Sequence, residues 1–170
     1  HVQADATETN VKRMNLSGYA IVAFSTYGLL GGESKALGEP ALVLTPPERG
    51  TELDDGLLTA SEVAQLKLNT DWVLLSACST AAADGTPGAE GLSSLSRAFF
   101  HAGSRSLLLS HWAAPSDVVL KLTTRTLRES ARGAGRAEAL QRSMFALMNG
   151  EERSEYVHPM FWAAFTIVGE

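Results

Sequence analysis

Two short apolar runs, each followed by a helical pattern, constrain the fold of this chain most. Residues 71–77 and 106–110 carry apolar side chains at nearly every interior position, which predicts strands that are buried on both faces. Apolar residues at helical spacing follow the first run, over residues 90–102. After the second run, Pro115 suits the first turn of a helix that we expect to reach about residue 131. Strands that alternate with helices form mostly parallel sheets with helices on both faces. The sequence therefore predicts an α/β fold.

The other segments continue this alternation around a glycine-rich loop. Asp5-Ala-Thr-Glu8 and Thr59-Ala-Ser-Glu62 have the spacing of capping boxes, which predicts Asp5 and Thr59 as the N-caps of two helices. Gly103 follows a helical pattern in the position of a C′ glycine. The remaining predicted elements are helices over about residues 6–14, 59–68 and 136–148, strands over residues 18–24, 41–45 and 161–168, and the loop over residues 25–40.

Composition places the chain among ordinary globular domains. Its 170 residues are 45% hydrophobic and 19% charged, which excludes a disordered chain and suits one domain without an internal linker. The net charge of −5 gives no electrostatic reason to expect nucleic acid or an anionic membrane as a partner, unless a local patch overrides it. No apolar run approaches the roughly 20 residues of a membrane-spanning helix.

The ends of the chain and its single cysteine bear on processing and location. The sequence starts at His1 without an initiator Met and without the pattern of a signal peptide, so we expect a fragment or a processed product. Cys78 excludes an internal disulfide and suits a reducing compartment, so we expect a cytoplasmic protein.

Candidate chemistry lies where predicted strands end. The segments 25–28, 76–80 and 110–112 each follow a strand, and ligands of parallel sheets bind beyond the carboxyl ends of the strands. Cys78 is placed there as a nucleophile, because its small neighbours let a peptide approach and backbone N–H groups can hold an oxyanion. On spacing alone, the other interpretation is stronger: a lone cysteine is most often a buried small hydrophobe.

Six motifs, in order along the chain, resemble those of CHAT domains. These domains are caspase-like, belong with the caspases, separases and gingipains, and are usually joined to tetratricopeptide repeats. The motif that carries the cysteine, Leu74-Leu-Ser-Ala-Cys-Ser-Thr80, resembles the family's "LSAC-x-T". The other five are Ala6-Thr7 with the helix after it, Asp55-Gly-Leu-Leu-Thr-Ala60, Glu90 to Phe100 with Ala102-Gly103, Ser110-His-Trp112 with Asp117, and His158-Pro-Met-Phe-Trp162 through Gly169.

The resemblance implies a fold and a domain organisation. We expect a caspase-like three-layer sandwich with a mostly parallel central sheet. Residues 1–170 would form a single partial CHAT domain, its C-terminal, cysteine-bearing part. The family's more N-terminal strands and its repeats are not recognisable in the sequence. A sheet edge left open by missing strands would pair with another copy, so we also expect a homodimer.

The resemblance also implies a cysteine endopeptidase with one departure. Cys78 occupies the nucleophile position, and the N–H groups of Gly28 and Cys78 would hold the oxyanion. The family's "[AS]-T-H-G" motif, however, reads Ser25-Thr26-Tyr27-Gly28 here, so Tyr27 takes the position of the catalytic histidine. A free phenol has a pKa of about 10 and is a poor base at neutral pH. We therefore expect an inactive peptidase, or alternatively a pseudopeptidase that serves as a protein-interaction or signalling module.

Further residues are candidates for the same site, each with a structural alternative. His111 is either a base that replaces the missing histidine or a structural residue beside Trp112. Trp112 itself either packs at the rim of the site or lines its substrate pocket. Asp117 and Asp84 either hold a basic side chain of the substrate or serve a helix N-terminus and a polar turn, respectively. Four histidines and one cysteine show no zinc spacing, and no phosphate-binding loop is present, so no metal or cofactor is expected. The expected partner is a protein or peptide.

Overall fold

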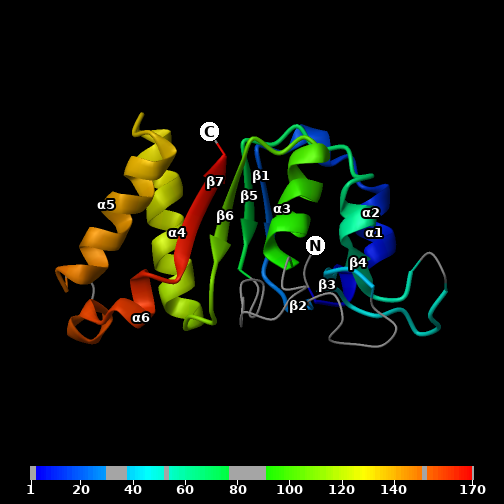
Figure 1. Cartoon of the computed structure of the whole chain (residues 1–170), viewed down its shortest axis with the longest axis horizontal. Coiled ribbons are helices and arrows are strands. Elements are labelled where there is room, and N and C mark those ends of the chain that lie inside the picture. Colours follow the sequence, from blue (N-terminus) through cyan, green and yellow to red (C-terminus); the bar gives the residue numbers. More distant parts are fainter. Residues whose placement is uncertain (1–2, 30–37, 52–53, 77–90, 151–152, 170) are drawn as a thin grey trace.

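Strands and helices alternate along most of the chain (Figure 1). The computed structural model describes residues 3–29, 38–51, 54–76, 91–150 and 153–169. The strands are β1 (Ile21–Phe24), β2 (Gly28–Leu29), β3 (Ala41–Val43), β4 (Leu57–Thr59), β5 (Trp72–Leu75), β6 (Ser106–Ser110) and β7 (Phe165–Gly169). The α-helices are α1 (Glu8–Arg13), α2 (Ala60–Val63), α3 (Gly91–His101), α4 (Ser116–Ala131), α5 (Arg136–Met148) and α6 (Pro159–Trp162). The 3₁₀ helices are η1 (Gln3–Asp5), η2 (Leu16–Gly18) and η3 (Ser154–Val157).

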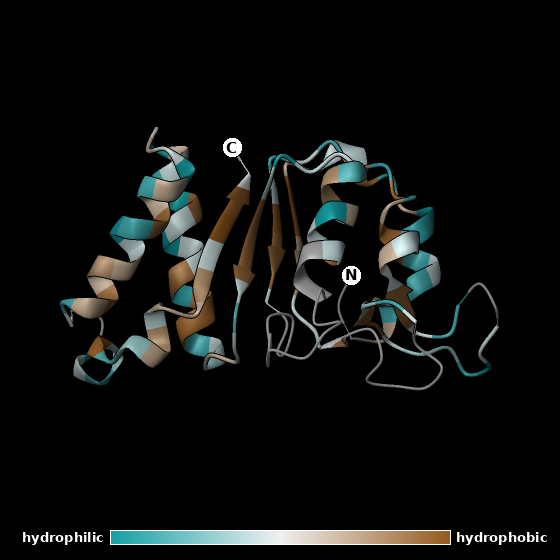
Figure 2. Ribbon diagram, in the orientation of Figure 1, coloured by the Kyte–Doolittle hydropathy of each residue, from teal (hydrophilic) through white to brown (hydrophobic). Residues whose placement is uncertain are grey.

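A central sheet of four strands has the order β1-β5-β6-β7. β1, β5 and β6 are parallel, and β7 returns antiparallel to β6. The two predicted central strands, β5 and β6, are buried along their whole length, as their apolar runs indicated. Figure 2 shows these strands as the most uniformly hydrophobic part of the molecule.

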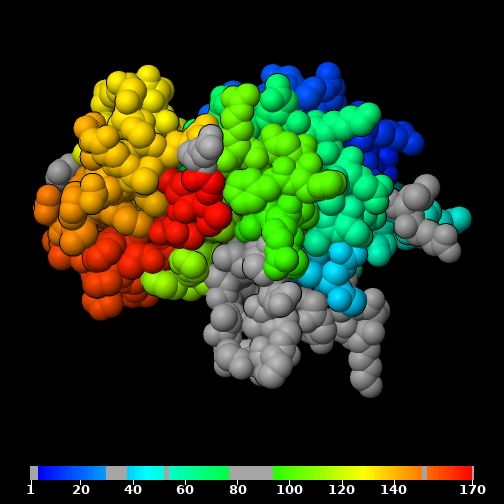
Figure 3. All heavy atoms as spheres, turned by 45° about the horizontal axis from the view of Figure 1, so that its top comes forward, coloured from blue at the N-terminus to red at the C-terminus, as the bar shows by residue number. Residues whose placement is uncertain are grey.

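Helices cover both faces of this sheet, so the molecule has three layers. Alternate residues of β5 and β6 point to opposite faces, as the two-residue period of a strand requires. Val73 and Leu107 pack in one core with Phe99 of α3. On the other face, Leu74 and Leu108 pack in a second core with α4 and α5. Helices α2 and α3 lie side by side on the outside of the first face (Figure 3).

A second, smaller sheet of three antiparallel strands, β2-β3-β4, joins β1 to α2. Thr59 opens α2 with a complete capping box, in which Glu62 accepts the Thr59 backbone N–H at 2.9 Å. Gly103 ends α3 with a φ of +105°, and a Cβ there would lie 2.5 Å from the Leu68 carbonyl oxygen. Both cap predictions are confirmed.

Some predicted boundaries are wrong. The strand predicted over residues 161–168 begins only at Phe165, because Pro159 starts a helical turn that His158 caps by accepting the Met160 N–H. The N-cap of α1 is Thr7 rather than Asp5. Helix α2 is four residues long rather than ten, and β4 lies in a segment where no strand was predicted.

Other boundaries are confirmed. The strand over residues 106–110 and the helix over residues 136–148 have the predicted ends. No helix in the described ranges is long and apolar enough to cross a membrane.

Candidate functional site

The carboxyl ends of β1, β5 and β6 lie at one edge of the central sheet, the lower edge in Figure 1. β5 is the middle strand of the three, and the sequence reaches Cys78 three residues after β5 ends. Tyr27 follows β1 and His111 follows β6, on opposite sides of β5. Since adjacent strands are about 5 Å apart, β1 and β6 are roughly 10 Å apart. The strand before His111 is thus a neighbour of the strand that leads to Cys78. Cys78 and Asp84 themselves lie outside the described residues.

The small sheet fixes the backbone around Tyr27. The Val43 N–H donates to the Tyr27 carbonyl at 2.8 Å, and the Thr26 hydroxyl donates to the Val43 carbonyl. The Ser76 N–H, at the end of β5, donates to the Phe24 carbonyl at 3.0 Å and ties the strand ends together. The Tyr27 side chain is 67% exposed. The backbone of the segment is thus held in place while its side chain faces solvent.

The ladder between β2 and β3 sets the direction of the Gly28 N–H. Antiparallel ladders alternate hydrogen-bonded with non-hydrogen-bonded pairs. Because Val43 donates to Tyr27, the next pair, Gly28 with Leu42, is a non-hydrogen-bonded one. The Gly28 N–H therefore points away from β3. This direction leaves it available to a ligand on the other side of β2, as an oxyanion donor requires.

A cavity of about 610 Å³ is lined by residues of β1, β3 and the first helices. Its lining includes Ser25 and Thr26, the two residues that precede Tyr27. It also includes apolar side chains such as Met14, Leu16 and Phe24. Ser25, Thr26 and Thr45 add hydroxyl groups at its lining. An apolar cavity with a few polar groups is the usual form of a binding site for a small ligand or a side chain.

His111 and Trp112 leave the sheet edge at the end of β6. The His111 backbone N–H donates to the Ala164 carbonyl at 2.6 Å, and its side chain is exposed. The His111 and Trp112 rings are 6.4 Å apart between centroids, at an angle of 35°. The Trp112 Nε1–H donates to the Met160 carbonyl at 2.9 Å, so α6 holds this segment although Trp112 remains 41% exposed.

Asp117 joins the start of α4 to η3. One carboxylate oxygen accepts the Val118 N–H at 3.0 Å, and the other accepts the Tyr156 hydroxyl. The hydrogen bond from Tyr156 lowers the pKa of Asp117, and the same bond raises the pKa of Tyr156. The Arg153 guanidinium lies 5.7 Å from the centre of the Tyr156 ring. The predicted first-turn position of Asp117 is confirmed, and both of its oxygens have protein partners.

Tyr156 and Met160 are residues of this region that the sequence did not predict. They lie 39 and 48 residues from their partners Asp117 and Trp112, so no local spacing pattern joins them. Within the described parts of the chain, no group of three or more His, Cys, Asp or Glu side chains is placed to hold a metal ion.

The comparisons with known proteins agree with this architecture. The family model of the CHAT domain matches residues 1–170, and the chain belongs to this family. Its fold is the caspase-like α/β fold, with a mostly parallel central sheet between helical layers. The chain is similar to tetratricopeptide repeat protein 28 of Mus musculus, with 31% identity over 113 residues, and to that of Homo sapiens, with 29% identity over 117 residues.

These relatives are far longer than this chain. The matches cover 66% and 69% of the chain but 4% of each relative. Both relatives are named as tetratricopeptide repeat proteins, which agrees with the association of CHAT domains with such repeats.

Proposed function

We propose that this chain is a cysteine-endopeptidase-like CHAT domain that keeps the nucleophile position at Cys78 but is inactive as a peptidase in its present form. The observation that carries the proposal is the position of Tyr27. It follows β1, the strand beside the one that leads to Cys78. By the resemblance of Ser25-Thr26-Tyr27-Gly28 to the family motif, it takes the position of the histidine. Hydrolysis needs a group that takes the thiol proton and returns it to the leaving amine. A phenol donates a hydrogen bond but is a poor acceptor of that proton at neutral pH.

The remaining parts of such a site have candidates in this chain. The Gly28 N–H, directed away from β3, is the proposed oxyanion donor, together with the N–H of Cys78. His111 follows the strand on the other side of β5 and is the candidate for a replacement base. The proposed substrate is a protein or peptide, with Asp117 and Asp84 as candidate contacts for a basic side chain. Since Asp117 already accepts two hydrogen bonds, a substrate cation would approach it beside Tyr156.

Cysteine labelling tests the proposed inactivity. The protein is incubated at neutral pH with a peptide-based, cysteine-reactive probe, with Cys78→Ala as the control. We expect Cys78 to react no faster than free cysteine, and we expect no cleavage of a peptide library, because the phenol of Tyr27 does not activate the thiol as an imidazole would. Rapid labelling of Cys78, or cleavage that Cys78→Ala abolishes, would overturn the proposal.

Restoring the imidazole tests whether Tyr27 is the cause. We expect Tyr27→His to gain cleavage that depends on Cys78, whereas the matched variant Tyr27→Phe gains none. If the unaltered chain cleaves peptides and His111→Ala abolishes that cleavage, His111 is the base and Tyr27 is not the limiting residue.

A second candidate function is a pseudopeptidase that binds protein segments without cleaving them. The exposed Tyr27 and Trp112 rings, on either side of β5 at the same sheet edge, favour it, because exposed aromatic side chains are frequent anchors of protein interfaces. This function predicts that peptides bind equally well to the unaltered chain and to Cys78→Ala. A loss of binding in Tyr27→Ala and Trp112→Ala would support it, and unchanged binding in both would contradict it.

Two further expectations concern assembly and location. In the described part of the chain, no strand pairs with the outer edge of β1, where Ile21 is 43% exposed. This open edge supports pairing with a second copy, which sedimentation analysis of the chain would detect as a dimer. The single cysteine supports a reducing, cytoplasmic location.

A further inference from the structure

His158 supplies the hydrogen-bond acceptors for the first turn of α6. Its ring nitrogen Nδ1 accepts the Met160 N–H at 3.2 Å, and its backbone carbonyl accepts the Phe161 N–H at 3.1 Å. Pro159, the first residue of the helix, has no N–H of its own. The imidazole therefore stands where a serine, threonine, aspartate or asparagine side chain usually caps a helix.

Met160 connects this cap to the rim of the candidate site. Its N–H is held by His158, and its carbonyl accepts the Trp112 Nε1–H at 2.9 Å. Trp112 follows β6 and is 41% exposed. The indole of Trp162, which belongs to α6 itself, donates instead to the Val157 carbonyl of η3 at 3.0 Å. Because an indole has one N–H, only the Trp112 ring of these two is tied to the backbone of α6.

A histidine cap depends on the charge of its ring. A neutral imidazole has one N–H and one acceptor nitrogen, whereas both nitrogens of the charged ring are donors. The His158 side chain is exposed, so solvent reaches it. Histidine side chains change charge between pH 5 and pH 8. Protonation therefore removes the acceptor of the Met160 N–H and places a positive charge among the N–H groups of the first turn.

We propose that His158 is a proton-sensitive cap that fixes the Trp112 ring at the rim of the candidate site. Neutral His158 holds the Met160 N–H, and Met160 holds the indole. When the pH falls through the histidine range, the first turn of α6 opens and the Trp112 indole loses its fixed acceptor. The position of Trp112 responds in this way whether or not the site cleaves peptides.

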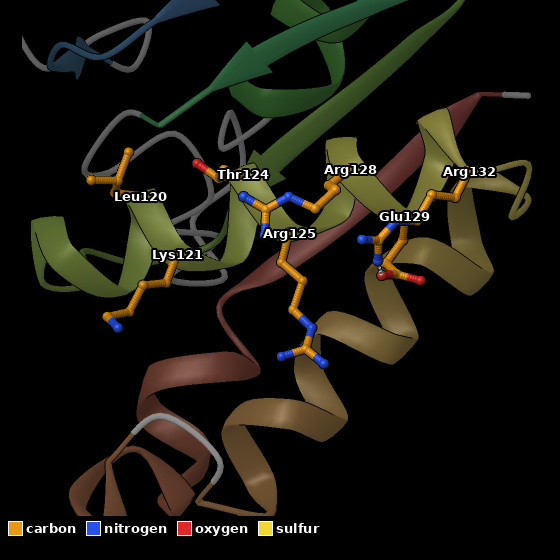
Figure 4. A pocket seen from close by; sticks show the side chains of 7 residues that line it. All are labelled: Leu120, Lys121, Thr124, Arg125, Arg128, Glu129 and Arg132. Carbon is orange, nitrogen blue, oxygen red and sulfur yellow. Dashed lines mark hydrogen bonds and ion pairs between the residues drawn. The ribbon is translucent and has the colours of Figure 1, made fainter.

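The charged groups of the elements packed against α6, which are α4, α5 and η3, keep their charge over this range. Figure 4 shows those along α4: Lys121, Arg125, Arg128, Glu129 and Arg132. On α5 and η3 they form ion pairs: Arg142 with Glu138, and Arg153 with Glu155. At the start of α4, the hydrogen bond from Tyr156 lowers the pKa of Asp117. None of these side chains therefore changes charge together with His158.

The test follows the three tryptophan indoles by NMR. The 170-residue chain is labelled with ¹⁵N-tryptophan, and the signals are assigned with Trp112→Phe and Trp162→Phe. Between pH 8 and pH 5.5 we expect the Trp112 Nε1–H signal to move along the titration curve of a single proton. The signal of Trp72, which is 5% exposed, should stay in place, and that of Trp162 should move less than that of Trp112. A Trp112 signal that does not move overturns the proposal.

Two substitutions separate the cap from the charge. His158→Asn keeps a side-chain acceptor that does not titrate, so the Trp112 signal should stay at its pH 8 position throughout. His158→Ala has no acceptor, so the signal should lie near its low-pH position already at pH 8. His111→Gln is the matched control, because the His111 ring is 6.4 Å from the Trp112 ring and titrates in the same range. We expect the titration to persist in His111→Gln; its loss there, with persistence in His158→Asn, would make His111 the sensor and overturn the proposal.

Solvent exchange of the Met160 N–H is a second, independent measurement. After correction for the intrinsic pH dependence of exchange, its protection should fall about fivefold between pH 8 and pH 5.5 in the unaltered chain, and by less than about twofold in His158→Asn. The amides of β6 serve as the reference and should keep their protection. Circular dichroism checks that each variant is folded, and if His158→Ala is not, the comparison with His158→Asn decides. Equal protection of Met160 at both pH values would contradict a cap that depends on the proton.

Discussion

The helical layer of α4 and α5 and the region of the small sheet are held together by different buried contacts. In the helical layer, apolar side chains such as Leu122 and Leu147 pack on Trp72, Leu74 and Leu108 of the central sheet. We call α1, β2, β3, β4 and α2 the small-sheet region. There, Glu8 is buried to 1% exposure, and its carboxylate accepts the N–H groups of Asp55 and Gly56 at 3.0 and 3.2 Å.

Lys12 extends the polar contacts of the small-sheet region. It forms ion pairs with Glu8 and, at 2.7 Å, with Glu62, which also caps α2. The short elements of this region also bury apolar side chains such as Leu42, Leu58 and Val63 in the first core, and the charged hydrogen bonds between elements add to that packing. Because this region holds the backbone of Tyr27, the geometry of the candidate site depends on these charges.

The largest expected effect is the loss of apolar packing in the helical layer. Leu122→Ala removes a side chain that is 1% exposed, and we expect it to lower the free energy of unfolding by about 3 kcal/mol. The neighbouring Leu120→Ala, at a side chain that is 66% exposed, should change it by less than about 0.5 kcal/mol. Urea unfolding measures both. Similar losses in the two variants would mean that α4 does not bury Leu122 against the sheet.

The second effect is the loss of the buried carboxylate in the small-sheet region. Glu8→Gln leaves one acceptor oxygen and removes the charge that pairs with Lys12, so we expect a loss of roughly 2 kcal/mol. Hydrogen exchange should accelerate at the amides of Asp55 and Gly56 but not at those of α5. The control Glu138→Gln, at an ion pair on the surface of α5, should leave the unfolding midpoint nearly unchanged. Uniform acceleration across both regions would contradict the difference between them.

The third prediction uses pH. Burial raises the pKa of Glu62, but hydrogen bonds from Lys12 and from Thr59 lower it by more, so its pKa in the folded protein lies below the ordinary value. The resulting stability is fully present above the ordinary carboxyl pKa of about 4.3 and is lost as the pH falls through the lower, folded value. Burial lowers the pKa of Lys12, but its bonds to Glu62 and Glu8 raise it by more. That contribution is present below the ordinary lysine pKa and is lost as the pH rises through the folded value.

The measurement is urea unfolding in steps from pH 5 to pH 3. We expect the free energy of unfolding to fall with pH, and the fall to be smaller in Glu62→Gln than in the unaltered chain. Glu48→Gln, at an exposed residue of the segment between β3 and β4, is the matched control and should keep the full dependence. An identical slope in all three proteins would show that the contacts of Glu62 do not contribute to acid sensitivity.

The same difference explains what the sequence could predict. The helix over residues 136–148 and the strand over residues 106–110 have the expected ends, because apolar periodicity reports burial directly. The small-sheet region was predicted less well. The three-residue strand β4 was not predicted, and the N-cap of α1 is Thr7 rather than the predicted Asp5. The backbone N–H groups that Glu8 accepts are 47 and 48 residues away, beyond any local pattern.

The candidate site shows the same limit. The positions of Tyr27 and His111 at strand ends followed from the alternation of strands and helices. The contacts that fix them, from Val43 to Tyr27 and from His111 to Ala164, join separate elements and appear only in the folded chain.

The smallest expected effect concerns a buried polar contact inside the helical layer. Thr126 of α4 and Ser143 of α5 are both fully buried, and their hydroxyl oxygens are 3.1 Å apart. The Thr126 hydroxyl also reaches the Leu122 carbonyl at 2.8 Å, and the Ser143 hydroxyl donates to the Ala139 carbonyl at 2.8 Å. A hydroxyl has one hydrogen, so Thr126 donates to either Ser143 or Leu122 and keeps a partner when Ser143 is removed.

Ser143→Ala should therefore lower the free energy of unfolding by only about 0.5–1 kcal/mol. In a double-mutant cycle with Thr126→Val, the coupling should stay within about 0.5 kcal/mol, because each hydroxyl can bond within its own helix. Glu8 differs because it accepts the backbone N–H groups of Asp55 and Gly56, which belong to another segment. Those two N–H groups lose their acceptor when the Glu8 carboxylate is removed. A coupling between Thr126 and Ser143 above about 1.5 kcal/mol would show that the helical layer also depends on buried polar contacts. The two regions would then differ in the charge of those contacts rather than in how far they rely on them.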